Sequence, residues 1–401
     1  MQTLATGEGS ISAEEHEQLT ASMHSLFTTR NIRKCVKMYF KFWHPNCQII
    51  HPPSFNPKTA QTPLLLVVAL MGALYSHHET TVHAAKKLLD VAELAVFSTG
   101  LFAPEHEMRC AYSGTEIPSD AISPLQFQEF QAAYLIVVLQ YWAGNRRAKN
   151  RAMETRFSEI IKVARKIDLP RSRQLPEDRI SQSFWIEKES RIRTMNIIWL
   201  MDCAFAFYQN YPGRLTLSEL DCDLPCAESI FEAPNPFTEE SFRFSRGITI
   251  HQAFEQLFLG QAESHPSGTN TPRPPSQDVG AVNSIEQLSL TVLDMNVLIH
   301  VLYAFINTHM TLSIPLQRIR RIQPSQTEDP TIMAIKGALA RWRSLWMALR
   351  SRVPSQEWAA KGFHQMAHNF WLDSVDVAMR MEAKCEDKLA KLKVLLQDGN
   401  I

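Results

Sequence analysis

The sequence predicts an all-α protein, a large irregular helical domain with an internal disordered linker. Apolar side chains recur at helical intervals through most of the 401 residues, and no alternation of apolar and polar residues longer than a few positions competes with this period. The chain is 45% hydrophobic and 20% charged, which suits a protein that buries one large core or two ordinary ones.

Capping residues and prolines mark the first helices. A helix over about 12–30 begins with Ser12 and Glu15, which have the spacing of a capping box. A second helix, over about 31–44, places its apolar side chains on one stripe, and Pro45 stops it. The segment that follows is rich in proline and is expected to be an ordered, extended loop.

Five further helical segments follow before residue 210. They cover about 64–78, 80–100, 125–142, 148–168 and 185–208. Gly100 is expected to cap the second of these helices, and the mixed segment 103–124 to form a surface loop. The turn that begins at Gly144 separates two helices that we expect to pack as a pair.

The last third of the chain begins with a linker. Residues 261–284 concentrate Pro, Ser, Gly, Thr and Asn with almost no large apolar side chain, which is typical of disorder. Helical periodicity returns over 285–312, about 328–353 and about 355–396. We therefore divide the chain into four parts. They are an N-terminal segment with the first helix (1–30), a helical core (31–260), the linker (261–284) and the C-terminal helices of the same region (285–401).

Charge and cysteine content exclude several classes of protein. Lys plus Arg and Asp plus Glu number 41 each, so only a local patch or a partner could bring the chain to nucleic acid. The seven scattered cysteines fit a reducing compartment. The longest apolar run, 64–75, is too short for a bilayer span of roughly twenty residues, so no membrane partner is expected.

Sequence signatures of catalysis are absent. The chain has no Gly-x-Gly-x-x-Gly, Walker, Gly-x-Ser-x-Gly or His-Glu-x-x-His motif. His364 and His368 have a spacing that puts two imidazoles on one helical face, but no third ligand is evident. Cys222 and Cys226 lack the second pair that a zinc site needs. We expect no enzyme and no catalytic or metal-binding residue.

Basic and aromatic clusters are also interpreted structurally. Two groups of cations are expected to form solvated helix faces, with a phosphate-binding surface and a weak nuclear-import signal as the alternatives. They are Arg146, Arg147, Lys149, Arg151 and Arg156, and Arg318, Arg320 and Arg321. Aromatic residues at helical spacing predict core packing, and the lining of a ligand cavity is the alternative. These aromatics are Phe40, Phe42, Trp43, Phe184, Trp185, Trp342, Trp346, Phe370 and Trp371.

Four stretches in order, at 39–56, 135–169, 185–202 and 211–225, resemble the regulatory "middle homology" region of fungal zinc-cluster and two-Cys-two-His finger transcription factors. They contain a His-Pro turn followed by His-Pro-Pro-Ser-Phe, a Gly-Asn-Arg-Arg turn, a Trp…Glu…Arg…Trp…Asp helix, and Gly-Arg-Leu followed by Asp-Cys-Asp-Leu-Pro. The residues that carry the resemblance are Trp43, His44, Pro45, His51, Pro52, Phe55, Gly144, Arg146, Glu189, Arg191, Trp199, Asp202, Arg214, Asp223 and Pro225. We expect them to maintain the fold, with partly buried ion pairs on the helix over 185–208.

The resemblance implies a transcriptional regulator in the nucleus, with a share in the cytoplasm, that controls a metabolic or secondary-metabolite biosynthetic gene set. Its implied partners are a second copy or a zinc-finger regulator in a dimer, and a small-molecule effector. Residues 1–34 contain no cysteine, so no DNA-binding residue is identified. DNA would be reached indirectly or through a missing module, and zinc is expected as a cofactor only of such a module.

Two other functions stay open at the level of the sequence. One is an all-α enzyme with an unrecognised site, for which His364 and His368 are the candidates. The other is a DNA-free interaction protein that titrates full-length regulators.

Overall fold

The computed structural model describes residues 12–98, 100–103, 122–176, 181–209, 211–259, 289–320 and 330–378. Within these ranges the chain is helical and has no strand, only an isolated antiparallel bridge between Asp223 and Thr249. The all-α prediction is therefore confirmed. Most of the expected loop 103–124 and the whole expected linker 261–284 lie outside the described residues.

The chain divides into two compact units that are discontinuous in sequence. Unit 1 comprises residues 1–197 and 225–246, and unit 2 comprises 198–224 and 247–401. The four-part division in chain order stays a prediction.

Unit 1 begins with α1 (Ala13–Leu26), α2 (Thr29–Met38), α3 (Thr62–Ala73) and α4 (Glu79–Phe97). The capping box before α1 is present as predicted, since Ser12 and Glu15 each bond the other's backbone N–H. The boundary between the first two helices falls slightly earlier than expected. Thr28 begins α2 by accepting a hydrogen bond from the backbone of Asn31.

The end of α2 widens before the chain turns. A π-helical turn spans Tyr39–Trp43, and a 3₁₀ turn spans His44–Asn46. Pro45 cannot donate a hydrogen bond, so the helix stops here as the sequence predicts. The turn leads residues 47–51 into the interior of unit 1, where Cys47 and Ile49 are buried.

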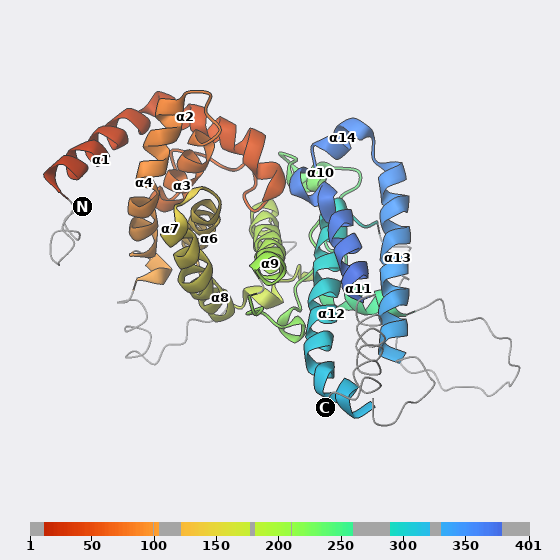
Figure 1. Cartoon of the computed structure of the whole chain (residues 1–401). Coiled ribbons are helices and arrows are strands. Elements are labelled where there is room, and N and C mark those ends of the chain that lie inside the picture. The colour runs from red at the N-terminus through yellow and green to blue at the C-terminus, as the bar shows by residue number, and fades with distance from the viewer. Residues whose placement is uncertain are drawn as a thin grey trace, which may run out of the picture. The chain divides into compact units, whose positions relative to one another are not determined.

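Helix α3 forms the centre of unit 1 and packs against α2, α4 and α6 (Pro124–Ala143) (Figure 1). Its sequence is apolar on all sides, as a helix surrounded by others requires. Gly72 permits the contact with α2, because a Cβ atom there would overlap the backbone carbonyl of Cys35. The prediction for Gly100 is wrong: Ser98 caps α4, and Gly100 starts a 3₁₀ turn over Gly100–Phe102 with φ 60°.

The expected paired helix after Gly144 is present. It consists of α7 (Arg146–Arg151), a π-helical turn (Ala152–Arg156) and α8 (Phe157–Lys166). Helix α9 (Gln182–Gln209) follows and runs from unit 1 into unit 2. The short helix α10 (Glu228–Phe231) has no counterpart in the sequence analysis.

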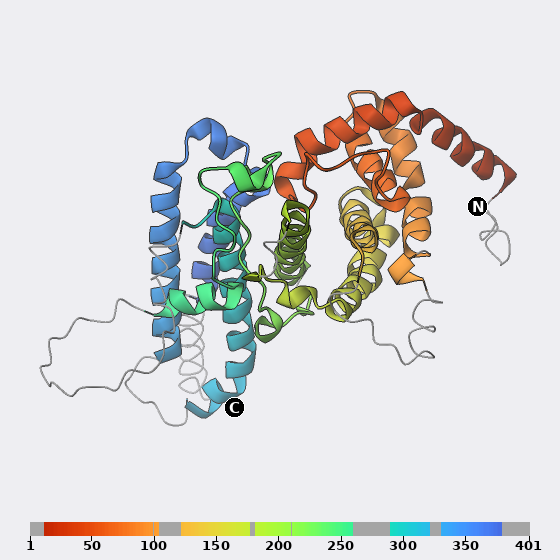
Figure 2. The same ribbon diagram turned by 180° about the vertical axis from the view of Figure 1, so that it is seen from behind.

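Unit 2 is built around α11 (Ile250–Phe258), α12 (Val292–Arg320) and α13 (Pro330–Arg352). Helix α11 lies across the two long helices, as both views show (Figures 1 and 2). The indole Nε1 of Trp342 is buried and donates to the carbonyl oxygen of Met295 at 2.9 Å, which ties α13 to α12.

The expected continuous helix over 355–396 is wrong within the described residues. The chain forms α14 (Ser355–Ala359), a 3₁₀ turn (Gly362–Met366) and a helix over 367–378. Gly362 has φ 58°, a left-handed conformation that interrupts a right-handed helix. No helix in the described part of the chain is long and apolar enough to span a membrane.

Candidate functional site

Three segments of unit 1 meet in a polar junction, which consists of Gln48, Glu189, Arg193, Cys226 and Glu232. Gln48 follows the turn at the end of α2, Glu189 and Arg193 lie one turn apart on α9, and the other two flank α10. The side chains of Glu189 and Arg193 are almost completely buried. Burial of a charge is costly without a partner, so the geometry of this junction decides whether unit 1 is stable.

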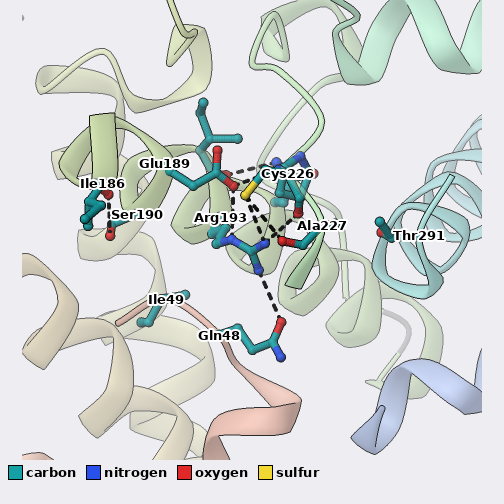
Figure 3. Close-up of polar contacts among 12 residues, drawn as sticks. Gln48, Ile49, Ile186, Glu189, Ser190, Arg193, Cys226, Ala227 and Thr291 are labelled. Carbon is teal, nitrogen blue, oxygen red and sulfur yellow. Dashed lines mark hydrogen bonds and ion pairs between the residues drawn. The ribbon is translucent and has the colours of Figure 1, made fainter. Parts of the chain in front are cut away.

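Arg193 uses each of its guanidinium nitrogens (Figure 3). Nε donates to Glu189 at 3.0 Å, Nη1 to the side-chain oxygen of Gln48 at 3.2 Å, and Nη2 to the carbonyl oxygen of Cys226 at 2.6 Å. The carboxylate of Glu189 also accepts from the backbone N–H of Cys226 at 2.8 Å. The pair therefore has hydrogen-bonding partners on three segments that are distant in sequence and joins them.

The thiol of Cys226 is not a reactive group in this setting. Burial, reinforced by the charge of Glu189, raises the pKa of Cys226 well above its usual range. Because only the thiolate is a strong nucleophile, we assign Cys226 a structural role.

Two histidines of the family motif extend the junction. Nε2 of His44 lies 3.6 Å from a carboxylate oxygen of Glu232, which also accepts from Gln48 at 3.2 Å. His51 donates through Nε2 to the carbonyl oxygen of Ala233 at 3.2 Å and lies 2.8 Å through Nδ1 from the hydroxyl of Ser54. Burial lowers the pKa of His44 and of His51, which favours the neutral form of both rings. His51 acts as a hydrogen-bonding spacer, whereas both ring nitrogens of His44 are buried without a hydrogen-bond partner among the described residues.

A cavity of about 440 Å³ in unit 1 adjoins this junction at His51. Its walls come from the loop 50–55, the first turns of α6 and the first turns of α9. The aromatic rings of Phe55, Phe127 and Phe184 supply apolar surface. The volume falls within the range of about 300–1,000 Å³ that small-molecule sites occupy.

The polar groups of the cavity are held in fixed positions. Gln131 donates to the carbonyl oxygen of Ile49 at 2.7 Å, and Gln128 accepts from the backbone N–H of Gln61 at 2.9 Å. Glu187 pairs with Arg191 at 2.8 Å. The cavity therefore presents aromatic surface and oriented hydrogen-bonding groups, and its carboxylate is already neutralised. Such a lining suits an uncharged aromatic or apolar compound.

Other motif residues of unit 1 support these segments. Trp43 is buried in the π-helical turn, and Pro45 ends it. Pro52 accepts from the backbone N–H of Phe55 at 3.3 Å in the turn that shapes the cavity wall. Arg191 also donates to the carbonyl oxygen of Ile122 at 3.0 Å.

A second turn of unit 1 holds Gly144 and Arg146, away from the junction. A Cβ atom on Gly144 would lie 2.5 Å from the carbonyl oxygen of Gln140, so only glycine fits between α6 and α7. Arg146 is exposed at the start of α7. The remaining motif residue of unit 1, Pro225, is buried and accepts from Arg246 at 3.0 Å.

The motif residues of unit 2 fix a loop and a bridge. Asp202 accepts from the backbone N–H groups of Arg214 at 2.7 Å and Leu215 at 2.9 Å, and the Arg214 guanidinium lies 3.5 Å away. Burial raises the pKa of Asp202 in spite of these contacts. Asp223 forms the isolated bridge, and Trp199 is buried on α9.

One prediction about the basic clusters is wrong, and another stays a prediction. Arg151 and Arg156 do not form a solvated face, because both pair with the buried carboxylate of Glu93, at 2.7 and 2.8 Å. The side chains of Arg318, Arg320 and Arg321 lie outside the described residues. Arg146, Arg147 and Lys149 are exposed, as expected.

The histidines of the enzyme alternative are not brought together around a metal position. Nδ1 of His364 lies 3.0 Å from the side-chain nitrogen of Asn296, and the His368 ring stacks on Trp371. Among the described residues, no group of three or more His, Cys, Asp and Glu side chains could hold a metal ion. Cys222 is buried in the bridge segment.

Gln48 and Glu93 cannot be found from the sequence, since nothing in their local spacing marks them as buried. Four exposed cations on α2 have a recognisable pattern that the predictions above do not include. These are Arg30, Arg33, Lys34 and Lys37, whose i, i+3, i+4, i+7 spacing without an acidic neighbour was a usable signal.

Comparisons with known proteins identify the family of the chain. The fungal specific transcription factor domain matches residues 36–344. The protein "Transcription factor verF" of Penicillium polonicum is 25% identical in an alignment of 393 residues, which covers 92% of this chain and 50% of that protein. The chain thus spans half the length of this curated relative, and no solved structure matches it. The match over most of its length shows that the chain belongs to the fungal specific transcription factor domain family.

Proposed function

We propose that this protein is a transcriptional regulator that acts in the nucleus through its helical regulatory domain. The observation that carries the proposal is the family match over residues 36–344, supported by the similarity to a named transcription factor. The side chains of the buried motif residues are engaged in the fold, so we propose a structural role for them. We assign no catalytic residue.

A finer part of the proposal concerns which genes the protein regulates. A metabolic or secondary-metabolite gene set is what the resemblance of the four motif stretches implies. DNA would be reached through a zinc-containing module or through a partner that carries one, since the described residues hold no metal-binding cluster.

The adjoining cavity supports a further part of the proposal, the binding of a small-molecule effector. Its wall contains His51, which also bonds the segment after α10. A ligand in the cavity would therefore contact His51 and, through it, could alter the contacts that join three segments of unit 1. That linkage is what an effector needs in order to favour one arrangement of the domain over another.

A tethering experiment tests regulatory activity. The chain is fused to an unrelated DNA-binding domain, and expression of a reporter gene with the matching binding site is measured in fungal cells. The proposal predicts that expression rises or falls at least several-fold relative to the DNA-binding domain alone. Unchanged expression at equal protein level contradicts it.

A further inference from the structure

A basic groove lies in unit 1, away from the polar junction and its cavity. It has a volume of about 820 Å³, and its two walls are α2 and the turn from α3 into α4. The residues that line it are Thr29, Arg30, Asn31, Arg33, Lys34, Cys35, Lys37, Met38, Ser76, His78 and Thr81. Four of these residues are cations, and none of them carries a carboxylate.

The cations form one face of α2. Arg30, Arg33, Lys34 and Lys37 recur at helical spacing over about 10 Å of helix axis, and all four side chains are exposed. Cys35 also lines the groove and is buried where α2 packs against α3. Like charges this close repel one another, so the arrangement is unfavourable unless an anion shares the face.

The second wall completes a set of hydrogen-bond donors. Ser76, His78 and Thr81 line the groove together with the cations, and the Ser76 hydroxyl accepts a hydrogen bond from the backbone N–H of His78 at 3.2 Å. The close packing of Gly72 on the Cys35 carbonyl holds this wall against α2, so the groove is part of the folded unit.

The geometry points to a binding site for a small anion with several phosphate groups. A phosphate carries close to two negative charges and three acceptor oxygens, so two or three linked phosphates would match four cations and the hydroxyl wall. Arginine binds phosphate in a bidentate manner and lysine as a point charge. The hollow has the size of a small-molecule site.

Two other polyanions fit the groove less well. A DNA duplex carries its phosphates on a convex cylinder and would contact the rim but leave the hollow unfilled. An acidic peptide carries one charge on each carboxylate, at wider separation than the charges of a polyphosphate. The proposal does not depend on the regulatory role of the protein.

Calorimetric titration of the full chain with inorganic tripolyphosphate tests the proposal. We expect one molecule to bind per chain, with an affinity that falls as salt rises. The double variant Arg33→Ser, Lys34→Ser should weaken binding at least tenfold. A matched control, Arg147→Ser, Lys149→Ser, removes the same charge from the exposed face of α7 and should change binding less than twofold.

A variant on the second wall distinguishes a groove from a charged surface. Thr81→Asp places a carboxylate opposite the intact cations and should also weaken tripolyphosphate binding at least tenfold. Circular dichroism and thermal unfolding check that each variant is folded.

Three outcomes overturn the proposal. Equal losses in the groove variant and the α7 control would mean nonspecific surface charge. Unchanged binding in Thr81→Asp would mean that the α2 face acts without the groove. Tighter binding of duplex DNA or of a poly-glutamate peptide than of tripolyphosphate, lost in the groove variant, would assign the surface to that macromolecule instead.

Discussion

Glu189 and Arg193 lie one turn apart on α9 and form an ion pair whose side chains are 2% and 0% exposed. Removal of one partner leaves a buried charge without compensation, which costs about 3–5 kcal/mol. We predict that Arg193→Met lowers the free energy of unfolding, measured by urea denaturation, by that amount.

The control for this prediction is the exposed pair of Arg171 and Asp168, whose side chains are 70% and 37% exposed. Arg171→Met should cost at most about 1 kcal/mol, because solvent screens such pairs. Similar losses in the two variants would contradict a structural role for the junction.

Gly72 and Gly337 give a second matched comparison. Gly72→Ala should destabilise the protein by more than about 1 kcal/mol, because the added Cβ overlaps the Cys35 backbone carbonyl and must push α2 from α3. Gly337→Ala on α13 meets open space and should stabilise by about 0.5–1 kcal/mol through helix propensity. Thermal unfolding of both variants measures these changes in stability. A Gly72→Ala variant more stable than the wild type would contradict the close contact between Gly72 and Cys35.

Protonation of His300 should make the stability of unit 2 depend on pH. It donates through Nδ1 to the carbonyl oxygen of Asn296 at 2.8 Å, and burial, with a smaller effect from His364, lowers its pKa to about 4. The unfolded chain takes up this proton near pH 6.5, whereas the folded chain does not until about pH 4. Stability is therefore lost as pH falls through this window, by up to about 3 kcal/mol.

The measurement is the free energy of unfolding between pH 7 and 4.5. The variant His300→Gln keeps a donor but does not titrate, so its stability should fall less steeply than that of the wild type. Some dependence should remain, because burial also lowers the pKa of His44 and His51. Identical slopes in the two proteins would show that His300 does not titrate as the structure requires.

A bulky side chain placed in the cavity beside the junction should reduce the binding of a small apolar compound there. Ser183 lines it from the first turn of α9 and is exposed, so Ser183→Trp should fill part of the space without disturbing the core. Binding of the uncharged apolar dye N-phenyl-1-naphthylamine should fall at least fivefold. Ser158→Trp, on the exposed surface of α8, should not lower dye binding; an equal fall would mean that the dye binds elsewhere.

Local signals in the sequence were sufficient for most helices. The capping box at Ser12, the stop at Pro45 and the long helix that became α9 depend on residues a few positions apart, and the structure contains all three. The helix over 355–396 failed because its apolar period continues through Gly362, whose left-handed backbone breaks it. Helices α10 and α11 are too short for periodicity to reveal.

The site required contacts that no local pattern contains. Glu189 and Arg193 were recognisable as an ion pair on one helix, but Gln48 reaches them across 145 positions of sequence. The cations of α2 had a visible spacing, yet the second wall of their groove comes from the turn after α3. Sequence spacing indicates which residues share a helix face; it does not indicate what packs opposite that face.

Promoter occupancy tests the central claim most directly. Chromatin immunoprecipitation of the tagged protein, expressed at its natural level in the fungal cells that contain it, should recover a defined set of promoters, with the protein in the nucleus. Transcript levels of the recovered genes should change when the protein is deleted. Retention in the cytosol with no enriched promoter would contradict the account.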